Sequence, residues 1–240
     1  MGSERFSRME ILFGSGACRR LSEARVLLCG LGAVGGFAAE ILARSGVGRF
    51  LLADSDAFDA TNVNRQIGAL ESTIGRRKTE VMRARILDIN PEADVSTSDT
   101  FIDETSIPGL LEWRPCVAVD AIDTIASKIS LMEAAFSGDI RLVASMGAAR
   151  RTDAGRVKTG PLSRTHSCPV ASRIRKGLRA LGSPADFPCV FSDEAPSPQS
   201  HLAWGGADSK KIIGSSPAVT AVFGVMLADL AIREILNDAL

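Results

Sequence analysis

The sequence of 240 residues lacks the features that mark membrane and secreted proteins. No apolar run reaches the ~20 residues that a transmembrane helix needs, and the start MGSERFSRME has no apolar signal-peptide core. Tyrosine is absent and aromatic residues make up 5% of the chain, so a surface that stacks on nucleic-acid bases is not indicated. We therefore expect a cytoplasmic protein that does not associate with a membrane.

Paired metal-binding cysteines are also missing. The five cysteines include no CxxC pair, so we expect no zinc site. An odd number of cysteines in a reducing compartment predicts free thiols rather than disulfides. His166 and His201 stand alone in the sequence, and we expect neither to have a role in a site.

Apolar runs alternate with helical patterns from residue 25 onward. Short apolar runs predict strands over residues 25–30, 49–54, 115–123 and 140–147. Helical spacing of apolar residues predicts helices over residues 33–46, 74–90 and 127–138. Such alternation is typical of a Rossmann-like, doubly wound α/β fold, with a mostly parallel sheet and helices on both faces.

The length fits a single domain over residues 1–240. Residues 1–22 precede the alternating part, and we expect them to form a helical arm. Residues 192–211 are rich in Ser, Pro and Gly, which predicts a mobile loop. The chain closes with a long apolar segment, which we expect to be a buried helix with Ser216 as its cap and Pro217 in its first turn.

A glycine-rich turn, Gly30-Leu-Gly32-Ala-Val-Gly35, joins the first predicted strand to the first helix. The first glycine allows a tight turn, the second lets the backbone approach a ligand, and the third lets helix and strand pack closely. Free N–H groups at the start of the helix attract phosphates. Asp54, at the end of the next strand, is placed to hydrogen-bond ribose hydroxyls. The pattern predicts a nucleotide site, although NAD enzymes share it.

The stretch DATNVNRQ, residues 59–66, follows that second strand. It holds Asn62, Arg65 and Gln66, whose polar side chains are costly to bury in a core. Nothing about NAD binding requires them. The stretch therefore favours a nucleotide that carries more negative charge than NAD.

Three charged residues further along complete this set. Lys78 lies on the following predicted helix, and Asp120 and Asp123 end a later strand, at the edge of the sheet where ligands bind. Lys78 and Arg65 are cations that can neutralise phosphate oxygens, and a terminal carboxylate can hold Mg²⁺. Together these residues indicate a nucleoside triphosphate with its metal ion.

From Arg5 through Asp123, this ordered set resembles the ubiquitin-activating-enzyme-like, ATP-dependent adenylyltransferases of the HesA/MoeB/ThiF type. The resemblance implies ATP and Mg²⁺ as cofactors, catalytic roles for Arg65 and Lys78, and Asp123 as the residue that serves Mg²⁺. The ATP-binding residues that we assign on these grounds are Gly30, Gly32, Gly35, Asp54, Asp56, Asn62, Arg65, Gln66, Lys78, Asp120 and Asp123.

The N-terminal segment RFSR resembles the RYxRQ segment of the same family. This resemblance implies that Arg8 reaches into the active site of a neighbouring subunit, and hence that the protein is a homodimer. Met9 follows Arg8 at the place where the family has glutamine.

The second half resembles one branch of the family, the tRNA threonylcarbamoyladenosine dehydratases. The similar segments are AVDAIDTIASK, MGAARRTDAGRVKTGPLSRTHSCPVASRIRKGLR and PCVFSDEAP. The resemblance implies ATP-dependent adenylation of a carboxylate, the threonylcarbamoyl group of a modified adenosine in tRNA, followed by dehydrative ring closure. A sulfur-transfer protein is a further candidate partner.

Basic residues concentrate in residues 150–179, which carry nine Arg or Lys against one acid, Asp153. Such a block suggests an anionic partner, here tRNA, with a solvated surface as the alternative. In the predicted helix CPVASRIRKGLRAL, the apolar face is formed by Val170, Ile174, Leu178 and Leu181. The basic residues that point elsewhere, and that we predict to bind tRNA phosphates, are Arg173, Lys176 and Arg179.

Several alternatives stay open. Cys189 is a candidate covalent acceptor, or else a buried residue in a strand. The enzyme could instead adenylate the C-terminal glycine of a ubiquitin-like sulfur carrier, although such relatives usually have a zinc site. An NAD-dependent oxidoreductase would explain the glycines but leave Arg65, Lys78 and Asp123 without a role. A non-catalytic partner subunit would not need those three residues either.

Overall fold

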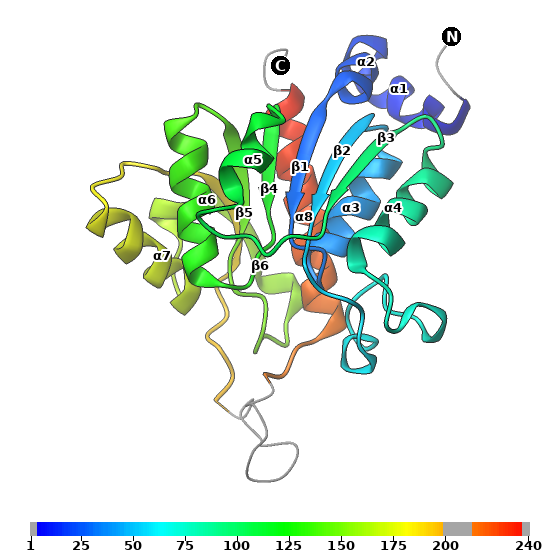
Figure 1. The fold of residues 1–240 in the computed structure, drawn as a ribbon. Helices are drawn as coiled ribbons and strands as arrows, with labels where there is room; N and C mark the ends of the chain where they lie inside the picture. Colours follow the sequence, from blue (N-terminus) through cyan, green and yellow to red (C-terminus); the bar gives the residue numbers. More distant parts are fainter. Residues whose placement is uncertain (1–3, 199–212, 237–240) are drawn as a thin grey trace.

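The computed structural model describes residues 4–198 and 213–236. In this part of the chain, the central sheet has seven strands in the order β3-β2-β1-β4-β5-β7-β6 (Figure 1). The strands are β1 Arg25–Cys29, β2 Arg49–Ala53, β3 Asp94–Ser98, β4 Val117–Asp120, β5 Arg141–Ser145, β6 Val157–Pro161 and β7 Pro188–Ser192. All neighbours pair in parallel except β6 and β7.

The strand order reverses direction at β1. This strand pairs with β2 on one side and β4 on the other, so Cys29 lies between Ala53 and Asp120. At such a reversal, the connections that leave the C-terminal ends of neighbouring strands run to opposite faces of the sheet, and a crevice for ligands opens between them. The predicted doubly wound α/β fold is confirmed.

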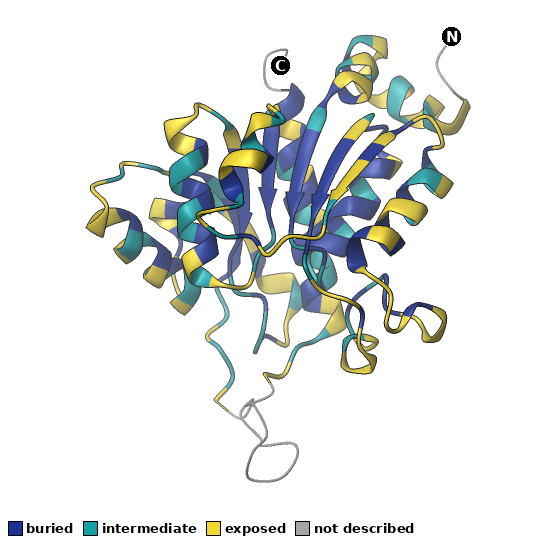
Figure 2. Ribbon diagram, viewed as in Figure 1, coloured by how far each residue is buried: buried dark blue, intermediate teal, exposed yellow. Residues whose placement is uncertain are grey.

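Helices cover both faces of the sheet, because the central strands are apolar on both sides. On one face, Leu28 and Leu52 belong to the same core as α3, α4 and α8, and on the other, Leu27 and Leu51 share a core with α5, α6 and α7. Figure 2 shows the buried strands between these two layers. The helices are α3 Gly35–Arg44, α4 Lys78–Ile89, α5 Ile107–Glu112, α6 Ile125–Ser137, α7 Pro169–Ala180 and α8 Pro217–Leu236.

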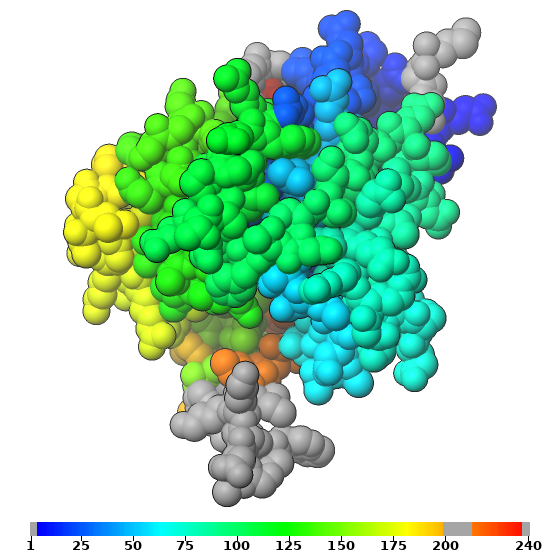
Figure 3. Space-filling view, viewed as in Figure 1, coloured from blue at the N-terminus to red at the C-terminus, as the bar shows by residue number. Residues whose placement is uncertain are grey.

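The N-terminal arm is helical, as expected, and lies at the end of the sheet where the strands begin (Figures 1 and 3). It comprises η1 Glu4–Phe6, α1 Ser7–Phe13 and α2 Ser15–Glu23. The remaining short helices are η2 Ala60–Asn62, η3 Glu71–Thr73, η4 Ala154–Arg156 and η5 Leu162–Arg164. Among the described helices, none has the length and apolar character to cross a membrane.

Some predicted boundaries differ from the structure. The helix expected from residue 74 begins at Lys78, because Gly75 has φ +83° and Arg77 is extended with ψ 134°. The strand expected to reach residue 123 ends at Asp120, whose side chain turns the backbone by accepting a hydrogen bond from Ile122 N–H. Pro217 does begin α8. Most of the predicted mobile loop, residues 192–211, lies outside the described residues, but Ser192 belongs to β7.

Candidate active site

The glycine-rich turn lies at the carboxyl edge of the sheet, the edge formed by residues that follow the C-terminal ends of the parallel strands. Gly30 has φ +89°, and a Cβ atom there would lie 2.7 Å from the carbonyl oxygen of Ala121. A Cβ atom on Gly35 would lie 1.8 Å from the Gly30 carbonyl oxygen. At Gly32 the nearest atom is Gln66 Nε2 at 3.8 Å. Two of these glycines are thus required by packing, whereas the backbone at Gly32 has room for a ligand.

Asp54 follows β2 and holds the glycine-rich turn in place. Its Oδ2 accepts a hydrogen bond from Leu31 N–H at 2.6 Å, and its Oδ1 accepts one from Asp56 N–H at 2.9 Å. Burial raises the pKa of this carboxyl above its ordinary value, and the charge of Lys78 opposes the rise. Each carboxylate oxygen keeps a further lone pair, so the predicted role at the ribose hydroxyls remains open to Asp54.

Lys78, the first residue of α4, brings a cation to the same cluster. Its Nζ lies 2.7 Å from Asp56 Oδ2 and 4.0 Å from Asp54 Oδ1. Lys78 is only 5% exposed, whereas the Asp56 side chain faces solvent. The ammonium group is therefore largely desolvated, and it is held by a solvent-exposed carboxylate that an incoming phosphate can replace.

The stretch DATNVNRQ forms η2 and the turn after it, at the carboxyl edge below β2 (Figure 1). Asp59 caps η2, and Asn62 Oδ1 accepts a hydrogen bond from Asp59 N–H at 3.2 Å. Arg65 donates to the Thr61 carbonyl oxygen at 2.8 Å. Gln66 is buried, and its Oε1 has no hydrogen-bond partner among the described residues. The stretch thus leaves polar groups with unused hydrogen-bonding capacity next to the glycine-rich turn.

The segment after β4 separates the two predicted aspartates. Asp123 is exposed, and Thr124 Oγ1 donates to its Oδ1 at 3.3 Å. Asp120 is fully buried, with its Oδ2 2.9 Å from Nζ of Lys128. Burial raises the pKa of the Asp120 carboxyl, and Lys128 opposes the rise. Asp120 was predicted to bind ATP, but its carboxylate has no exposed surface in this structure and faces Lys128, so its position does not support a direct contact.

Lys128 was not identified from the sequence, although a signal for it exists. On α6 it shares a face with Leu131, Met132 and Ala135, all fully buried. Apolar residues at i+3, i+4 and i+7 from a lysine place that lysine on the buried face of a helix. The pattern therefore indicates a buried cation, which needs a partner.

Arg8 lies on α1, at the amino edge of the sheet, which we define as the edge where the strands begin. The residue is exposed, and the glycine-rich turn is at the opposite edge. Next to it, Ile11 and Leu12 are 85% and 72% exposed. Within one subunit, Arg8 is therefore not part of the cluster around Lys78.

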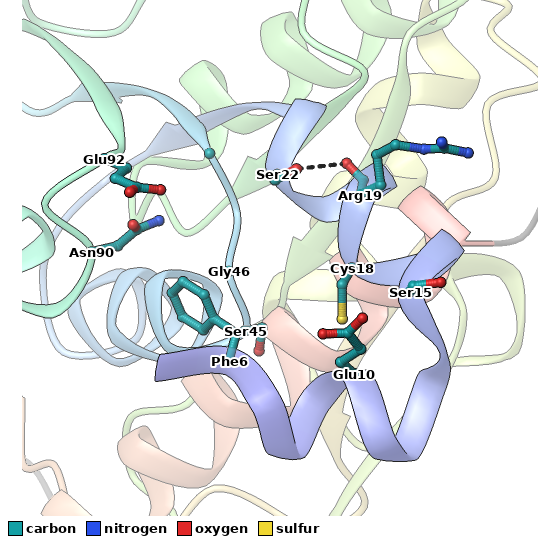
Figure 4. A pocket seen from close by; sticks show the side chains of 11 residues that line it. Phe6, Glu10, Ser15, Cys18, Arg19, Ser22, Ser45, Gly46, Asn90 and Glu92 are labelled. Carbon is teal, nitrogen blue, oxygen red and sulfur yellow. Dashed lines mark hydrogen bonds between the residues drawn. The ribbon is translucent and has the colours of Figure 1, made fainter. Parts of the chain in front are cut away.

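The amino edge also carries a hollow of about 650 Å³. Figure 4 shows the side chains of Glu10 and Cys18 pointing toward one another in it. Other lining residues are Ser45 and Gly46, which precede β2, and Glu92, which precedes β3. None of the predicted ATP-binding residues lines this hollow.

The basic residues of segment 150–179 divide into two groups. Some are occupied within the chain: Arg156 and Lys158 pair with Asp193 at 2.7 and 2.5 Å, and Arg175 donates to the Leu162 carbonyl oxygen at 3.1 Å. Arg151 is 2% exposed, and burial lowers its pKa. The residues that are exposed, and whose side chains make no ion pair or hydrogen bond in the described part, are Arg164, Arg173, Lys176 and Arg179.

Helix α7 is amphipathic, with one correction to its predicted apolar face. Ile174 and Leu178 are buried, and Val170 is half-buried. Leu181, however, is 60% exposed, because the helix ends at Ala180 and the next residue leaves the apolar face. Arg173, Lys176 and Arg179 face solvent on this helix, as the pattern predicted.

The cysteines and histidines add little to the site. Cys189 is fully buried in β7, and burial raises the pKa of its thiol to about 12. Both features favour the alternative of a buried strand residue over a covalent acceptor. His166 is exposed beside Phe191, and His201 lies outside the described residues. No three His, Cys, Asp or Glu side chains in the described part gather into a metal-binding group.

Comparison with known proteins shows which family and which relatives this chain resembles. The sequence profile of the ThiF family matches residues 6–239. A Bacillus subtilis (strain 168) protein named tRNA threonylcarbamoyladenosine dehydratase is 40% identical over 241 residues, 97% of this chain and 95% of that protein. The structure of the Escherichia coli protein of that activity, TcdA, in complex with ATP has a TM-score of 0.90 at 32% identity, covering 98% of this chain and 95% of the other. The E. coli molybdopterin-synthase adenylyltransferase is 31% identical over 62% of this chain and 59% of that protein. This chain belongs to the ThiF family.

Proposed function

We propose that the protein is an ATP-dependent adenylating dehydratase that acts on the threonylcarbamoyl carboxylate of a modified adenosine in tRNA. The observation that carries the proposal is the cluster at the carboxyl edge, where Asp54, Lys78 and the glycine-rich turn come together. The cluster supports a nucleotide site, and two relatives of nearly the same length carry the dehydratase name or structure.

The chemistry explains why ATP is needed. A carboxylate is a poor electrophile, so its oxygen first attacks the α-phosphorus of ATP and displaces pyrophosphate. A nucleophile within the same modified nucleoside then attacks the acyl carbon, and AMP leaves with the former carboxylate oxygen. The net result is loss of the elements of water. The second step is intramolecular, and holding both groups in one geometry strongly favours it.

Different residues of the chain bind ATP and neutralise the charge of its phosphates. Backbone N–H groups at the start of α3 face the phosphates, and Asp54 accepts hydrogen bonds from the ribose. Lys78 and Arg65 neutralise phosphate charge, and charge on the leaving pyrophosphate grows as the bond breaks. In the free protein, Lys78 forms an ion pair with Asp56, whose Oδ2 lies 2.7 Å from Lys78 Nζ.

A magnesium ion fits the donor set at Asp123. Mg²⁺ needs few protein ligands when substrate phosphates supply the others, so one exposed carboxylate is sufficient. Asp123 is such a carboxylate, on the segment that packs against Gly30. When bound, the ion would neutralise phosphate charge.

The assembly that we propose is a cytoplasmic homodimer. α1 presents exposed Ile11 and Leu12, which a second subunit would cover, and Arg8 lies beside them. Because Arg8 is remote from its own carboxyl edge, any catalytic role requires the partner's site. Mixing Arg8→Ala with Asp123→Ala subunits should therefore restore some activity. A chain that sediments as a monomer at micromolar concentration would contradict this arrangement.

The first test is ATP–pyrophosphate exchange, with threonylcarbamoylated tRNA as acceptor. We expect exchange in the parent and none above background in Asp123→Asn, with tRNA binding unchanged. Exchange only with a ubiquitin-like carrier protein would instead support sulfur-carrier activation. Stabilisation of the fold by NAD and not by ATP would contradict adenylation altogether.

The second test concerns the tRNA surface, which we place on α7. Replacing Arg173 and Lys176 by Ser should lower the slope of log affinity against log salt by about two units, since each phosphate contact contributes about one. The matched control replaces Arg156 and Lys158, also one arginine and one lysine, whose side chains both pair with Asp193. Equal slopes for the two double variants would exclude α7 as the tRNA surface.

A further inference from the structure

An ion pair lies fully buried beneath the candidate active site. Lys128 Nζ is 2.9 Å from Asp120 Oδ2, and neither side chain has any exposed surface. Apart from this contact, neither atom has a hydrogen-bond partner among the described residues. Lys128 is surrounded on α6 by apolar neighbours, including Leu131 and Met132. Such a pair is a poor source of stability, because desolvation of both charges offsets their attraction, and apolar residues often replace it without loss.

The pair joins the two ends of the segment that carries Asp123. Asp120 is the last residue of β4, and Lys128 lies in the first turns of α6, where its N–H donates to the Thr124 carbonyl oxygen at 3.0 Å. The residues between them, 121–124, include the exposed Asp123. A contact between β4 and α6 therefore fixes the distance that this segment must span.

The same carboxylate also shapes the segment directly. Asp120 Oδ1 accepts a hydrogen bond from Ile122 N–H at 3.0 Å. Ala121 N–H donates to the Cys29 carbonyl oxygen at 2.8 Å, and the Ala121 carbonyl packs against Gly30. Lys128 thus orients a carboxylate that holds the backbone next to Asp123 and opposite the glycine-rich turn.

We propose that Lys128 and Asp120 are positioning residues, which hold segment 121–124 so that Asp123 faces the nucleotide and its metal ion. This inference rests on the proposed function for the role of Asp123. It accounts for an ion pair in an apolar layer, since a methionine or leucine could fill the volume but could not bind Ile122 N–H.

The test removes the pair without leaving a buried charge. In the double variant Asp120→Leu/Lys128→Met, the fold should remain, because both charges disappear together. Loss of the positioning contact should raise the Mg²⁺ concentration for half-maximal pyrophosphate exchange about 10-fold or more. The Lys128→Arg variant keeps the charge and should retain most of the activity. The control Asp229→Leu/Arg233→Met removes an exposed ion pair on α8 and should leave the Mg²⁺ dependence at the parental value.

A second readout does not depend on activity. In the double variant, hydrogen exchange at Ile122 N–H should become about 10-fold faster, the expected effect of losing one hydrogen bond, while amides within β4 keep their parental protection. Parental exchange at Ile122 together with parental Mg²⁺ dependence would overturn the proposal. If the parent catalyses no pyrophosphate exchange with any acceptor, the proposed function fails. Faster amide exchange in the variant would then still establish the contact, and unchanged amide exchange would overturn it as well.

Discussion

The two edges of the sheet differ in the hollows and in the charged side chains that they present to a ligand. The amino edge has space, in the hollow of about 650 Å³ between the N-terminal arm and the connections into β2 and β3. A second, smaller hollow of about 380 Å³ lies where β4 and β5 begin. At the carboxyl edge, Asp54 and Lys78 come from separate parts of the sequence and lie beside the glycine-rich turn, and the segment that carries Asp123 packs against Gly30.

The difference shows that the direction of the strands, and not the size of a hollow, marks the candidate site. In parallel strands every C-terminal end reaches the same edge, so side chains that follow β1, β2 and β4 converge there. The amino edge is formed by helix ends and by the connections into the strands. Its acidic side chains Glu10 and Glu92 form no ion pair within the described residues.

The largest effect is expected at Lys78. Changing Lys78→Met removes a desolvated cation from the phosphates and leaves the buried Asp54 without its nearby positive charge. Pyrophosphate exchange should fall by about 10²–10³-fold, the usual loss when one preorganised group that stabilises transition-state charge is removed. Arg19→Met, in the hollow at the amino edge, is the control and should retain parental exchange. Similar losses in both variants would erase the distinction between the edges.

Two glycines, one at each edge, separate stability from binding. A Cβ atom would lie 1.8 Å from a backbone oxygen at both Gly35 and Gly48, the latter against Ser22. Gly35→Ala and Gly48→Ala should each lower the free energy of unfolding by about 1–3 kcal/mol, since a well-packed backbone must shift. Only Gly35→Ala should also weaken ATP binding, measured by calorimetry at a temperature where both variants are folded. Weaker binding in Gly48→Ala would mean that the two edges are coupled.

A smaller, pH-dependent effect is expected at Asp54. Its pKa is raised in the folded protein, so on acidification it takes up a proton before an unfolded chain would. Its carboxylate therefore disfavours folding at neutral pH, and this penalty disappears as the pH falls through the folded pKa. In the proposed function this carboxylate accepts hydrogen bonds from the ribose of ATP, so the affinity for ATP should decline over the same pH range. Melting shifts caused by ATP at pH 7 and pH 5 should differ more in the parent than in Asp54→Asn, and an equal difference would contradict the ribose role.

The smallest effect is expected at Glu92, an exposed residue that lines the hollow at the amino edge. Glu92→Gln should change the free energy of unfolding by less than about 0.5 kcal/mol, as surface substitutions usually do. Pyrophosphate exchange and the melting shift with ATP should stay at parental values. A clear loss of exchange would show that the hollow takes part in the reaction and that the carboxyl edge is an incomplete description of the site.

Elements that depend on local pattern could be predicted from the amino-acid sequence alone. The glycine-rich turn, the apolar strands at β1 and β2 and the order of strands and helices gave the fold, because periodicity and turn chemistry are local properties. The predicted order of elements also placed Asp54, after the second strand, and Lys78, on the next helix, at the same edge of the sheet. The solvent-facing stripe of Arg173, Lys176 and Arg179 on α7 likewise followed from helical spacing.

The accessibility of the polar groups became clear from the three-dimensional structure. Asp120 and Asp123 look alike in the sequence, yet one lies buried against Lys128 and the other faces solvent, because β4 ends between them. In the basic segment, Arg156 and Lys158 both pair with Asp193, a residue 35 or more positions away that follows β7, the strand next to β6. Leu181 is exposed rather than part of the apolar face, because α7 ends one residue earlier, at Ala180. The pairing of Arg156 and Lys158 with Asp193 depends on contacts between residues distant in the chain, which local pattern does not specify.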